Sequence, residues 1–508
     1  MKQFSIALSI CFAAIFSSFA AENDLSIEAL LRSDIEIFIE AKSVAGTVAD
    51  LKNFQNLFGS DSLDFVQELN EASGIDIFNV TSLQNAGIDV KRSCGFAIFN
   101  RTEEEIGELL IPTTDAETLS NVFKRTVAKL HEKDADDEQF APTSTSYKNF
   151  KIDQLDENIF TTSINNYFVI GNDEKIVKSS IDIALSGKNS LAEDSLYLDY
   201  EKKKNVSSHS VSMFVRGTMF AKEMSNDDED AVNVYLKSIK YIIAGTSFKK
   251  DGIALQVGVF LDNNSSTATK VLSCLKTGTT DMILVDNDSV IYSFLSLDLQ
   301  AIDKLCQDDP LLAEGYMEIL KSASEEYGVD LQKDVIPYGG VFNTMVGDIM
   351  KNEFVVYCPM NDASKSLALG KKIQAHMKSK YEPEGMFGYE AVGSYGKAAY
   401  YFDSSGKKNY VYSDQRGLYV GNSIALINAA NKRQTLGKSK GKLAAKLTNE
   451  VWSFAHIKKN ELLFSAASRQ LNSSGDVFSR IGDMNFYFKK ADLFLSLDAD
   501  IAISALKR

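Results

Sequence analysis

Six short segments recur in the same order in the two halves of this 508-residue chain, and this recurrence constrains the fold more than any other feature. Partner segments are separated by 240 to 254 residues, which is too regular a spacing for chance matches. We therefore predict two tandem units built on one plan, residues 22–278 and residues 279–508. The clearest pairs are "LLIPTTDAETL" (109–119) with "VVYCPMNDASKSL" (355–367), "YFVIGND" (167–173) with "LYVGNS" (418–423), and "FKKDGIALQV" (248–257) with "FKKADLFLSL" (488–497).

The first of these pairs predicts a strand followed by a helix in each unit. Thr114 and Glu117 have the spacing of a capping box, which starts a helix. The apolar residues that follow recur with the period of one helix face. The partner helix, from Asp362 to about Lys378, carries Gly370 in its interior. The apolar face of the first helix consists of Leu119, Val122, Phe123, Val127 and Leu130.

After this helix, each unit has the pattern of an antiparallel meander. Between residues 387 and 421, aromatic and small residues alternate with turn signals such as "DSSGKK". Each unit then closes with "FKK" and an alternating apolar run, which is typical of a half-buried strand. We predict an α+β fold in which helices cover one face of a mainly antiparallel sheet.

The two Gly-Asn turns, Gly171-Asn172 and Gly421-Asn422, each join a strand to an apolar helical run. A glycine turn before a helix can hold a phosphate, but neither turn has the further glycines or the lysine of such a site. We interpret both as strand-to-helix turns, with the asparagine or the residue after it capping the helix.

The first twenty residues, "MKQFSIALSICFAAIFSSFA", have the pattern of a signal peptide that is cleaved after Ala20. No other run of about 18 apolar residues follows, so we expect an exported chain without a transmembrane segment, in the periplasm or outside the cell. The formal net charge is −15, which argues against nucleic acid and anionic membranes as partners.

Four cysteines follow the signal peptide, and in an oxidising compartment they permit three pairings. Cys274 and Cys306 flank the centre of the chain and are a candidate disulfide. Alternatively, all four cysteines, which include Cys94 and Cys358, are small buried apolar residues.

Motifs of catalysis and cofactor binding are missing from the sequence. No Gly-x-Ser-x-Gly, Cys-x-x-Cys or zincin motif occurs, and "LGKSKGK" at 436–442 lacks the first glycine of a phosphate loop. We therefore assign no catalytic residue, no metal ligand and no cofactor, and favour a protein that is not an enzyme. The tyrosine-rich meander offers candidate ligand-binding residues, with a sheet that simply carries tyrosines as the alternative. These candidates are Tyr395, Tyr400, Tyr410 and Tyr412.

The stretch "GVDLQKDVIPYGGVFNTMVGD" at 328–348 resembles the signature of a bacterial family of exported proteins, domain of unknown function 3352. Unit one departs from this signature, with Ala86 and a single Gly87 where Pro and Gly-Gly are expected. The family brings no catalytic residues. The matching positions are Gly328, Asp330, Asp334, Pro337, Gly339 and Gly340, followed by Asp362, Ala363 and Gly421.

Three functions follow from these observations. The first is an exported, non-enzymatic envelope protein that binds an unidentified partner or ligand across its two units. The second is a secreted hydrolase with an unrecognised site. The third is a carrier of an apolar molecule in a cavity between sheet and helices, which requires an apolar pocket of a few hundred Å³.

Overall fold

The computed structural model describes residues 26–58, 64–99, 106–133, 140–203, 209–219, 236–262, 264–278, 289–349, 351–433, 447, 450–459 and 481–503. The predicted signal peptide lies outside these residues, as do residues 279–288 at the start of the predicted second unit. The chain forms two compact units. Unit 1 comprises residues 1–228, 239–259 and 503–508, and unit 2 comprises residues 229–238 and 260–502.

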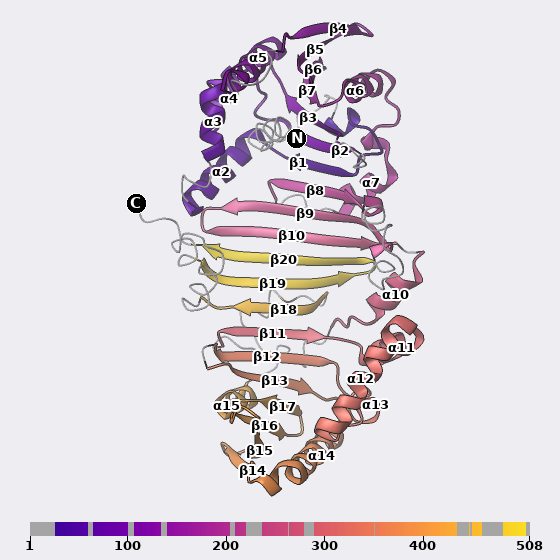
Figure 1. The fold of residues 1–508 in the computed structure, drawn as a ribbon, viewed down its shortest axis with the longest axis vertical. Helices are drawn as coiled ribbons and strands as arrows, with labels where there is room; N and C mark the ends of the chain where they lie inside the picture. The colour runs from indigo at the N-terminus through magenta and orange to yellow at the C-terminus, as the bar shows by residue number, and fades with distance from the viewer. Residues whose placement is uncertain are drawn as a thin grey trace. The chain divides into compact units, whose positions relative to one another are not determined.

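Unit 1 contains an antiparallel sheet whose central strands are not consecutive in the sequence (Figure 1). Its strands lie in the order β4-β5-β6-β7-β3-β2-β1-β8-β9-β10. The first four form the predicted meander. The strands are β1 (Ile37–Ala41), β2 (Cys94–Phe99), β3 (Ile106–Pro112), β4 (Thr143–Tyr147), β5 (Phe150–Asp156), β6 (Ile159–Ile164), β7 (Tyr167–Gly171), β8 (Val211–Arg216), β9 (Ile239–Lys249) and β10 (Gly252–Leu261), which belongs to unit 1 as far as Val259.

Helices pack on both faces of this sheet. Leu109 and Ile111 of β3 share an apolar core with residues of α2, α4 and α5. Side chains alternate along a strand, so Glu108 lies on the opposite face, where α6 packs. On that second face, the ring of Tyr197 in α7 contacts Phe38 of β1. The helices are η1 (Ile27–Ala29), α2 (Val44–Phe58), α3 (Asp64–Ser73), α4 (Val80–Asn85), α5 (Ala116–Lys133), α6 (Glu174–Ser186), η3 (Leu191–Glu193) and α7 (Ser195–Lys203).

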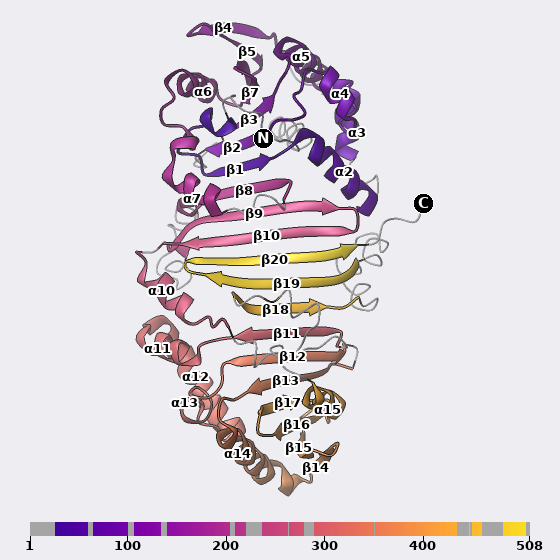
Figure 2. The same cartoon turned by 180° about the vertical axis from the view of Figure 1, so that it is seen from behind.

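Unit 2 has the strand order β14-β15-β16-β17-β13-β12-β11-β18-β19-β20, again antiparallel wherever the register is defined. Figure 2 shows these strands from behind. They are β11 (Ile291–Ser296), β12 (Val341–Asp348), β13 (Glu353–Pro359), β14 (Phe387–Val392), β15 (Gly396–Phe402), β16 (Lys408–Ser413), β17 (Gly417–Gly421), β18 (Val451–Ile457), β19 (Ile481–Ala491) and β20 (Phe494–Ile503).

Helices cover both faces of the unit 2 sheet as well. Val411 of β16 packs with Ile373 and Met377 of α14, whereas its neighbours Tyr410 and Tyr412 pack with Ile427 of α15. The helices are α10 (Ser266–Ser273), α11 (Leu299–Asp308), α12 (Pro310–Tyr327), α13 (Leu331–Asp334), α14 (Ala363–Tyr381), η6 (Glu382–Glu384) and α15 (Ile424–Lys432).

The α+β class and the antiparallel strand pairing agree with the sequence prediction. The helices differ from it because each unit has a second helical layer formed by the segments after β7 and β17. The predicted capping box at Thr114 is wrong, since Asp115 caps α5 by accepting a hydrogen bond from the Thr118 N–H. Among the described residues, no helix is long and apolar enough to cross a membrane.

Candidate functional site

An apolar pocket lies in unit 1 between the sheet and helices α2 to α5. Ile111 of β3 forms part of its floor, and Val122 and Phe123 of α5 form part of its wall. The loop between α3 and α4 contributes Ile75 and Ile77. The remaining lining residues are Val44, Val48, Leu69, Ser73, Leu83, Ile88, Leu119 and Thr126.

The two hydroxyl groups in this lining already have hydrogen-bond partners in the protein. Thr126 Oγ1 donates to the Val122 carbonyl at 2.9 Å. Ser73 Oγ donates to the Leu69 carbonyl at 2.6 Å and accepts from the Ile75 N–H at 3.1 Å. A ligand would therefore meet a chemically apolar surface, and burial of its own apolar area would be the main source of affinity.

The loop that contributes to this lining is held by side-chain hydrogen bonds. The Ile77 N–H donates to Asn70 Oδ1 at 3.0 Å, and the Asp76 N–H donates to Ser82 Oγ at 3.0 Å. The cavity itself has a volume of about 70 Å³, and the empty space reaches about 670 Å³ only when the open solvent at its mouth is counted. A cavity of this volume has room for part of a slender apolar group and not for a bulky ring system.

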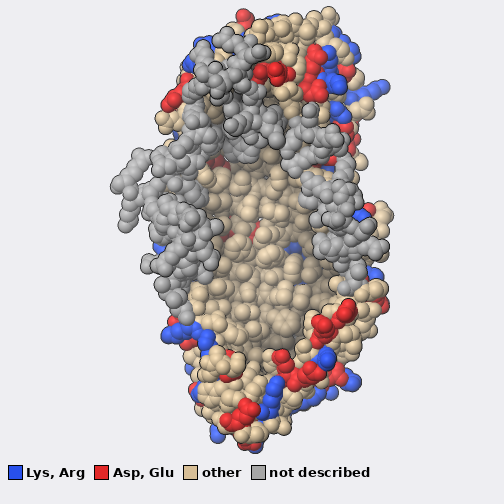
Figure 3. Space-filling model, viewed as in Figure 1, with Lys and Arg blue, Asp and Glu red and all other residues tan. Residues whose placement is uncertain are grey.

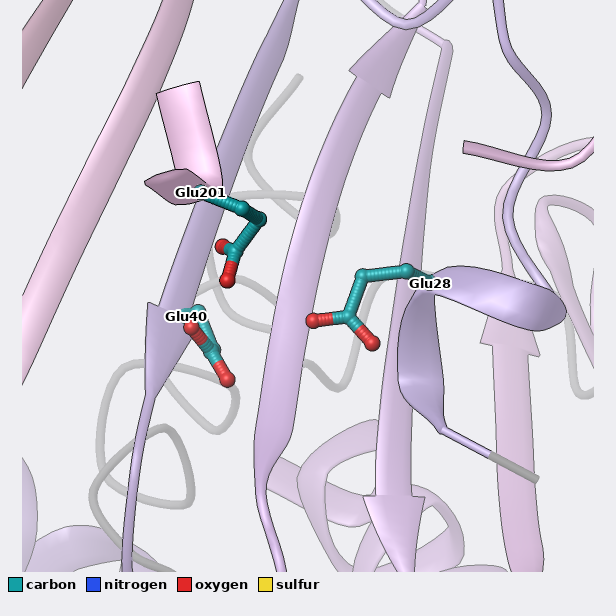
Figure 4. Close-up of side chains that lie close together, drawn as sticks. All are labelled: Glu28, Glu40 and Glu201. Carbon is teal, nitrogen blue, oxygen red and sulfur yellow. The ribbon is translucent and has the colours of Figure 1, made fainter. Parts of the chain in front are cut away.

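Three glutamates that are distant in the sequence meet on the other face of unit 1. Figure 4 shows the carboxylates of Glu28, Glu40 and Glu201, which come from η1, β1 and α7. One oxygen of each lies within 4.8 Å of the others. Tyr197 donates its hydroxyl proton to Glu28 Oε1 at 3.3 Å, and burial followed by the charges of the three glutamates raises its pKa well above the ordinary value. Carboxylate oxygens are ligands of Ca²⁺, so among the described residues this group could hold a divalent cation.

Glu108 is a further carboxyl group that sequence reasoning missed. It is 1% exposed, and its Oε1 accepts a hydrogen bond from Ser180 Oγ at 2.7 Å. Its Oε2 has no hydrogen-bond partner among the described residues. Burial raises the pKa of Glu108 to about 8, against the smaller lowering effects of Ser180 and Arg32. The group is therefore protonated at neutral pH.

The four candidate tyrosines do not form one surface. Tyr410 and Tyr412 are buried in the core, and their hydroxyls donate to Glu390 Oε2 and to the Tyr395 carbonyl. Tyr400 is half-buried, with Lys408 Nζ 4.3 Å from its ring centroid. Only Tyr395 of the four is exposed, at 51%. Helix α15 covers the face of the sheet that carries the buried pair. Ligand binding by these tyrosines stays a prediction.

The four cysteines of the described chain are free thiols. Burial raises the pKa of Cys358 to about 11, and burial also raises the pKa values of Cys274 and Cys306. Thiols with raised pKa values are poor nucleophiles. The Cys274–Cys306 disulfide remains a prediction.

Both Gly-Asn turns have a structural role. Asn172 Oδ1 accepts from the Gly107 N–H at 2.8 Å, and Asn422 Oδ1 accepts from the Phe354 N–H at 2.8 Å. The residue after each asparagine caps the helix: Asp173 accepts from the Lys175 N–H and Ser423 from the Leu426 N–H. The turns therefore extend the sheet and begin a helix.

The signature residues at 328–340 also have backbone roles. Gly328 has φ +67° and lies against the His376 ring, where a Cβ would come within 2.7 Å. Asp330 caps α13 by accepting from the Lys333 N–H. Gly340 has φ +138°, and a Cβ there would meet the Leu297 carbonyl oxygen at 2.4 Å. Gly328 and Gly340 are glycines because the backbone conformation and the lack of space for a side chain require it. None of the three residues needs a bound ligand to explain its identity.

The chain can be compared with protein-family models, with curated proteins and with solved structures. Residues 54–339, more than half of the chain, match the family model described as "Protein of unknown function (DUF3352)". The match ends at Gly339, within the signature stretch. No curated protein matches the chain.

Among solved structures, crystal form III of TP0453 aligns with 11% identity and a TM-score of 0.29, covering 52% of this chain and 91% of that one. Crystal form IV aligns with 9% identity and a TM-score of 0.28, covering 47% and 81%. At these TM-scores the likeness supports no conclusion about fold or function.

Proposed function

The chain belongs to the DUF3352 family of proteins of unknown function, and from this premise we propose that it is an exported, non-enzymatic binding protein whose first unit holds an apolar ligand. The observation that carries the proposal is the apolar pocket between the sheet and helices α2 to α5. Export rests on the signal-peptide pattern of residues 1–20.

The ligand class follows from the lining and the size of the pocket. The hydroxyls of Ser73 and Thr126 are bonded to the protein, so the lining offers no free polar side chain to a ligand. A single hydrocarbon chain fits this description, because each buried CH₂ contributes about 0.8 kcal/mol without needing a hydrogen bond. The polar end of such a molecule would stay at the mouth, in water.

This proposal combines two of the functions expected from the sequence, ligand binding and apolar carriage. The pocket reaches the few hundred Å³ that carriage requires only when the open space at its mouth is counted, so a ligand would lie partly outside the cavity of about 70 Å³. The hydrolase alternative has less support. The group formed by Glu28, Glu40 and Glu201 does bring carboxylates together, but these residues do not line the pocket described above. Partner binding by the two units together remains a hypothesis, for which pull-down from the native envelope is the test.

A pocket-filling variant tests the carrier proposal. In α14 of unit 2, the position that corresponds to Thr126 is occupied by Ile373. Thr126→Ile places that larger side chain in the pocket. We expect the full chain to bind the fluorescent fatty acid cis-parinaric acid at a saturable site, and the variant to bind it at least tenfold more weakly.

The control is Asn121→Ile, which adds the same side chain at an exposed position of the same helix. It should leave the titration unchanged. A wild-type chain that shows no saturable binding contradicts the carrier proposal. Export is tested separately by N-terminal sequencing of the protein from its native envelope, where an N-terminus other than Ala21 contradicts cleavage after Ala20.

A further inference from the structure

Unit 2 has a second pocket of different chemistry, between the ends of α12 and α14 and the turn after β15. It has a volume of about 790 Å³ and is open to solvent. Tyr327 ends α12, Tyr381 ends α14, and Tyr401 lies on β15. The other lining residues are Glu326, Lys380, Met386, Phe402, Asp403, Ser404 and Gly406.

The aromatic part of the lining is held in place by ring contacts. The Tyr381 and Tyr401 rings stack with centroids 4.7 Å apart and planes 17° apart. The end of α12 is tied to α14 by His376 Nε2, which lies 3.2 Å from the Glu325 carbonyl oxygen. These contacts indicate a preformed wall, which lowers the entropic cost of binding.

The turn is also fixed, by a single carboxylate. Asp403 Oδ1 accepts from the Ser405 hydroxyl at 2.6 Å and from the backbone N–H groups of Ser405 and Lys407. The Ser405 hydroxyl, and next the Lys407 N–H, hold the pKa of Asp403 at about 2. The carboxylate therefore stays charged at every physiological pH.

Acidic side chains outnumber basic ones in the lining of the pocket. Glu326 and Asp403 are two carboxylates against one cation, Lys380. The pKa of Tyr401 is raised to about 12, first by burial, then by neighbouring tyrosines and these two carboxylates. Lys380 Nζ lies 5.5 Å from the Tyr381 ring centroid, so a cation already faces an aromatic ring here. Figure 3 shows charged side chains of both signs over the helices of unit 2.

From the aromatic lining and the two carboxylates, we propose that this pocket binds an organic cation of the quaternary ammonium class. Such a cation is attracted by the faces of aromatic rings and loses little hydration on entry. Glu326 and Asp403 add electrostatic attraction, and Lys380 opposes it. The proposal is independent of the apolar pocket in unit 1.

A pair of isosteric ligands tests the proposal on the full chain. Choline and 3,3-dimethyl-1-butanol have the same shape, but only choline is charged. Calorimetric titration should show choline binding in the millimolar range, and binding of the neutral alcohol at least tenfold weaker. Equal binding of the two compounds overturns the proposal, as does binding of methyl glucoside without choline.

Two variants with opposite expected effects on choline affinity make the test more specific. Glu326→Gln changes an exposed side chain and should weaken choline binding about twofold to fivefold, whereas Lys380→Gln should strengthen it by a similar factor. Glu325→Gln changes the adjacent carboxylate, which does not line the pocket, and is the matched control. Unchanged affinity in both pocket variants overturns the proposal.

The same cation could be free in solution or part of a lipid headgroup. Phosphatidylcholine vesicles, with phosphatidylglycerol vesicles as the comparison, distinguish these sources. Binding of free choline assigns a small molecule. Binding only to phosphatidylcholine vesicles, weakened by Glu326→Gln, assigns the headgroup. A chain that binds neither choline nor phosphatidylcholine overturns the proposal.

Discussion

Among the described residues, the two units have a similar order of elements. In each, three helices separate the first two strands, a helix follows the third strand, a four-stranded meander follows that helix, and another helix follows the meander; unit 1 then adds η3 and α7 before β8. The central pairings correspond as well: β1 pairs with β2 and β8, and β11 pairs with β12 and β18. We propose from these correspondences that the two units arose by tandem duplication, and the repeat predicted from the sequence stays a prediction.

The units differ in how closely the helix after the third strand approaches the sheet. In α14, a Cβ at Gly370 would meet Ser413 Oγ at 1.8 Å, so the helix lies directly against β16. The corresponding residue of α5 is Phe123, whose ring contacts Phe168 at a centroid distance of 5.9 Å. A large residue at this position holds the helix away from the sheet. The apolar pocket of unit 1 lies beside it.

A second difference lies on the opposite face. Unit 1 buries the carboxyl of Glu108 against the hydroxyl of Ser180, whereas the corresponding positions in unit 2 are Val355 and Ala430. Both pairs join the third strand to the helix after the meander. The contact between the third strand and the helix after the meander therefore accepts either a polar or an apolar pair. The two pairs should differ in how the stability of the protein depends on pH.

The largest expected effect comes from converting the unit 1 pair into the unit 2 pair. Glu108 has a folded-state pKa of about 8, and an unfolded carboxyl titrates near 4.5. The folded protein therefore keeps a proton that the unfolded chain releases, and wild-type stability falls as pH rises from 4.5 to 8. The double variant Glu108→Val/Ser180→Ala should lack this loss and gain about 3–5 kcal/mol over the wild type at pH 9.

Urea unfolding of both proteins at several pH values between 4.5 and 9 measures this difference. The single variant Ser180→Ala keeps the titrating carboxyl and is the control. Parallel pH profiles of the wild type and the double variant would show that Glu108 titrates normally in the folded state.

A single added methyl group should disrupt the close packing of α14 against β16 in unit 2. Gly370→Ala forces α14 away from Ser413, and we expect a loss of about 2–3 kcal/mol in the free energy of unfolding. Adding Ser413→Gly removes the clash and should restore most of the loss. Urea unfolding of the four proteins of this cycle gives the coupling energy, and a coupling near zero contradicts close packing at this contact.

The sequence predicted those features that depend on neighbouring residues. Leu119, Val122, Phe123 and Val127 are buried as one helix face, and the helix after Gly421 begins at the expected turn. It could not predict features that depend on distant segments. Glu28, Glu40 and Glu201 come together from three elements, and no local pattern marks their meeting.

The same limit applies to Gly370 and to the tyrosines of β16. The sequence shows that Gly370 lies inside a helix but does not show that it allows α14 to approach the sheet. The alternation in β16 was visible, but the helix that covers its tyrosine-bearing face comes later in the chain. Period-two patterns show that two faces differ, and tertiary packing decides whether each is covered.

The smallest expected effect tests whether the two Gly-Asn turns are equivalent. Asn172 and Asn422 each accept from a strand N–H through Oδ1, and their own N–H groups donate to the carbonyls of Gly107 and Phe354. Alanine keeps the second bond and removes the first, leaving a partly buried N–H without this acceptor; in unit 2 it also removes the exposed bond that Asn422 Nδ2 donates to the Asn352 carbonyl at 2.6 Å. Each substitution should cost about 1–2 kcal/mol in urea unfolding, and the two costs should agree closely. The control is Asn121→Ala, which changes an exposed helix position and should leave the free energy of unfolding unchanged. Because the bond lengths are equal at 2.8 Å, a large loss of stability in one unit and none in the other would mean that the turns share a conformation but not an energetic role, and the two units would then be stabilised differently.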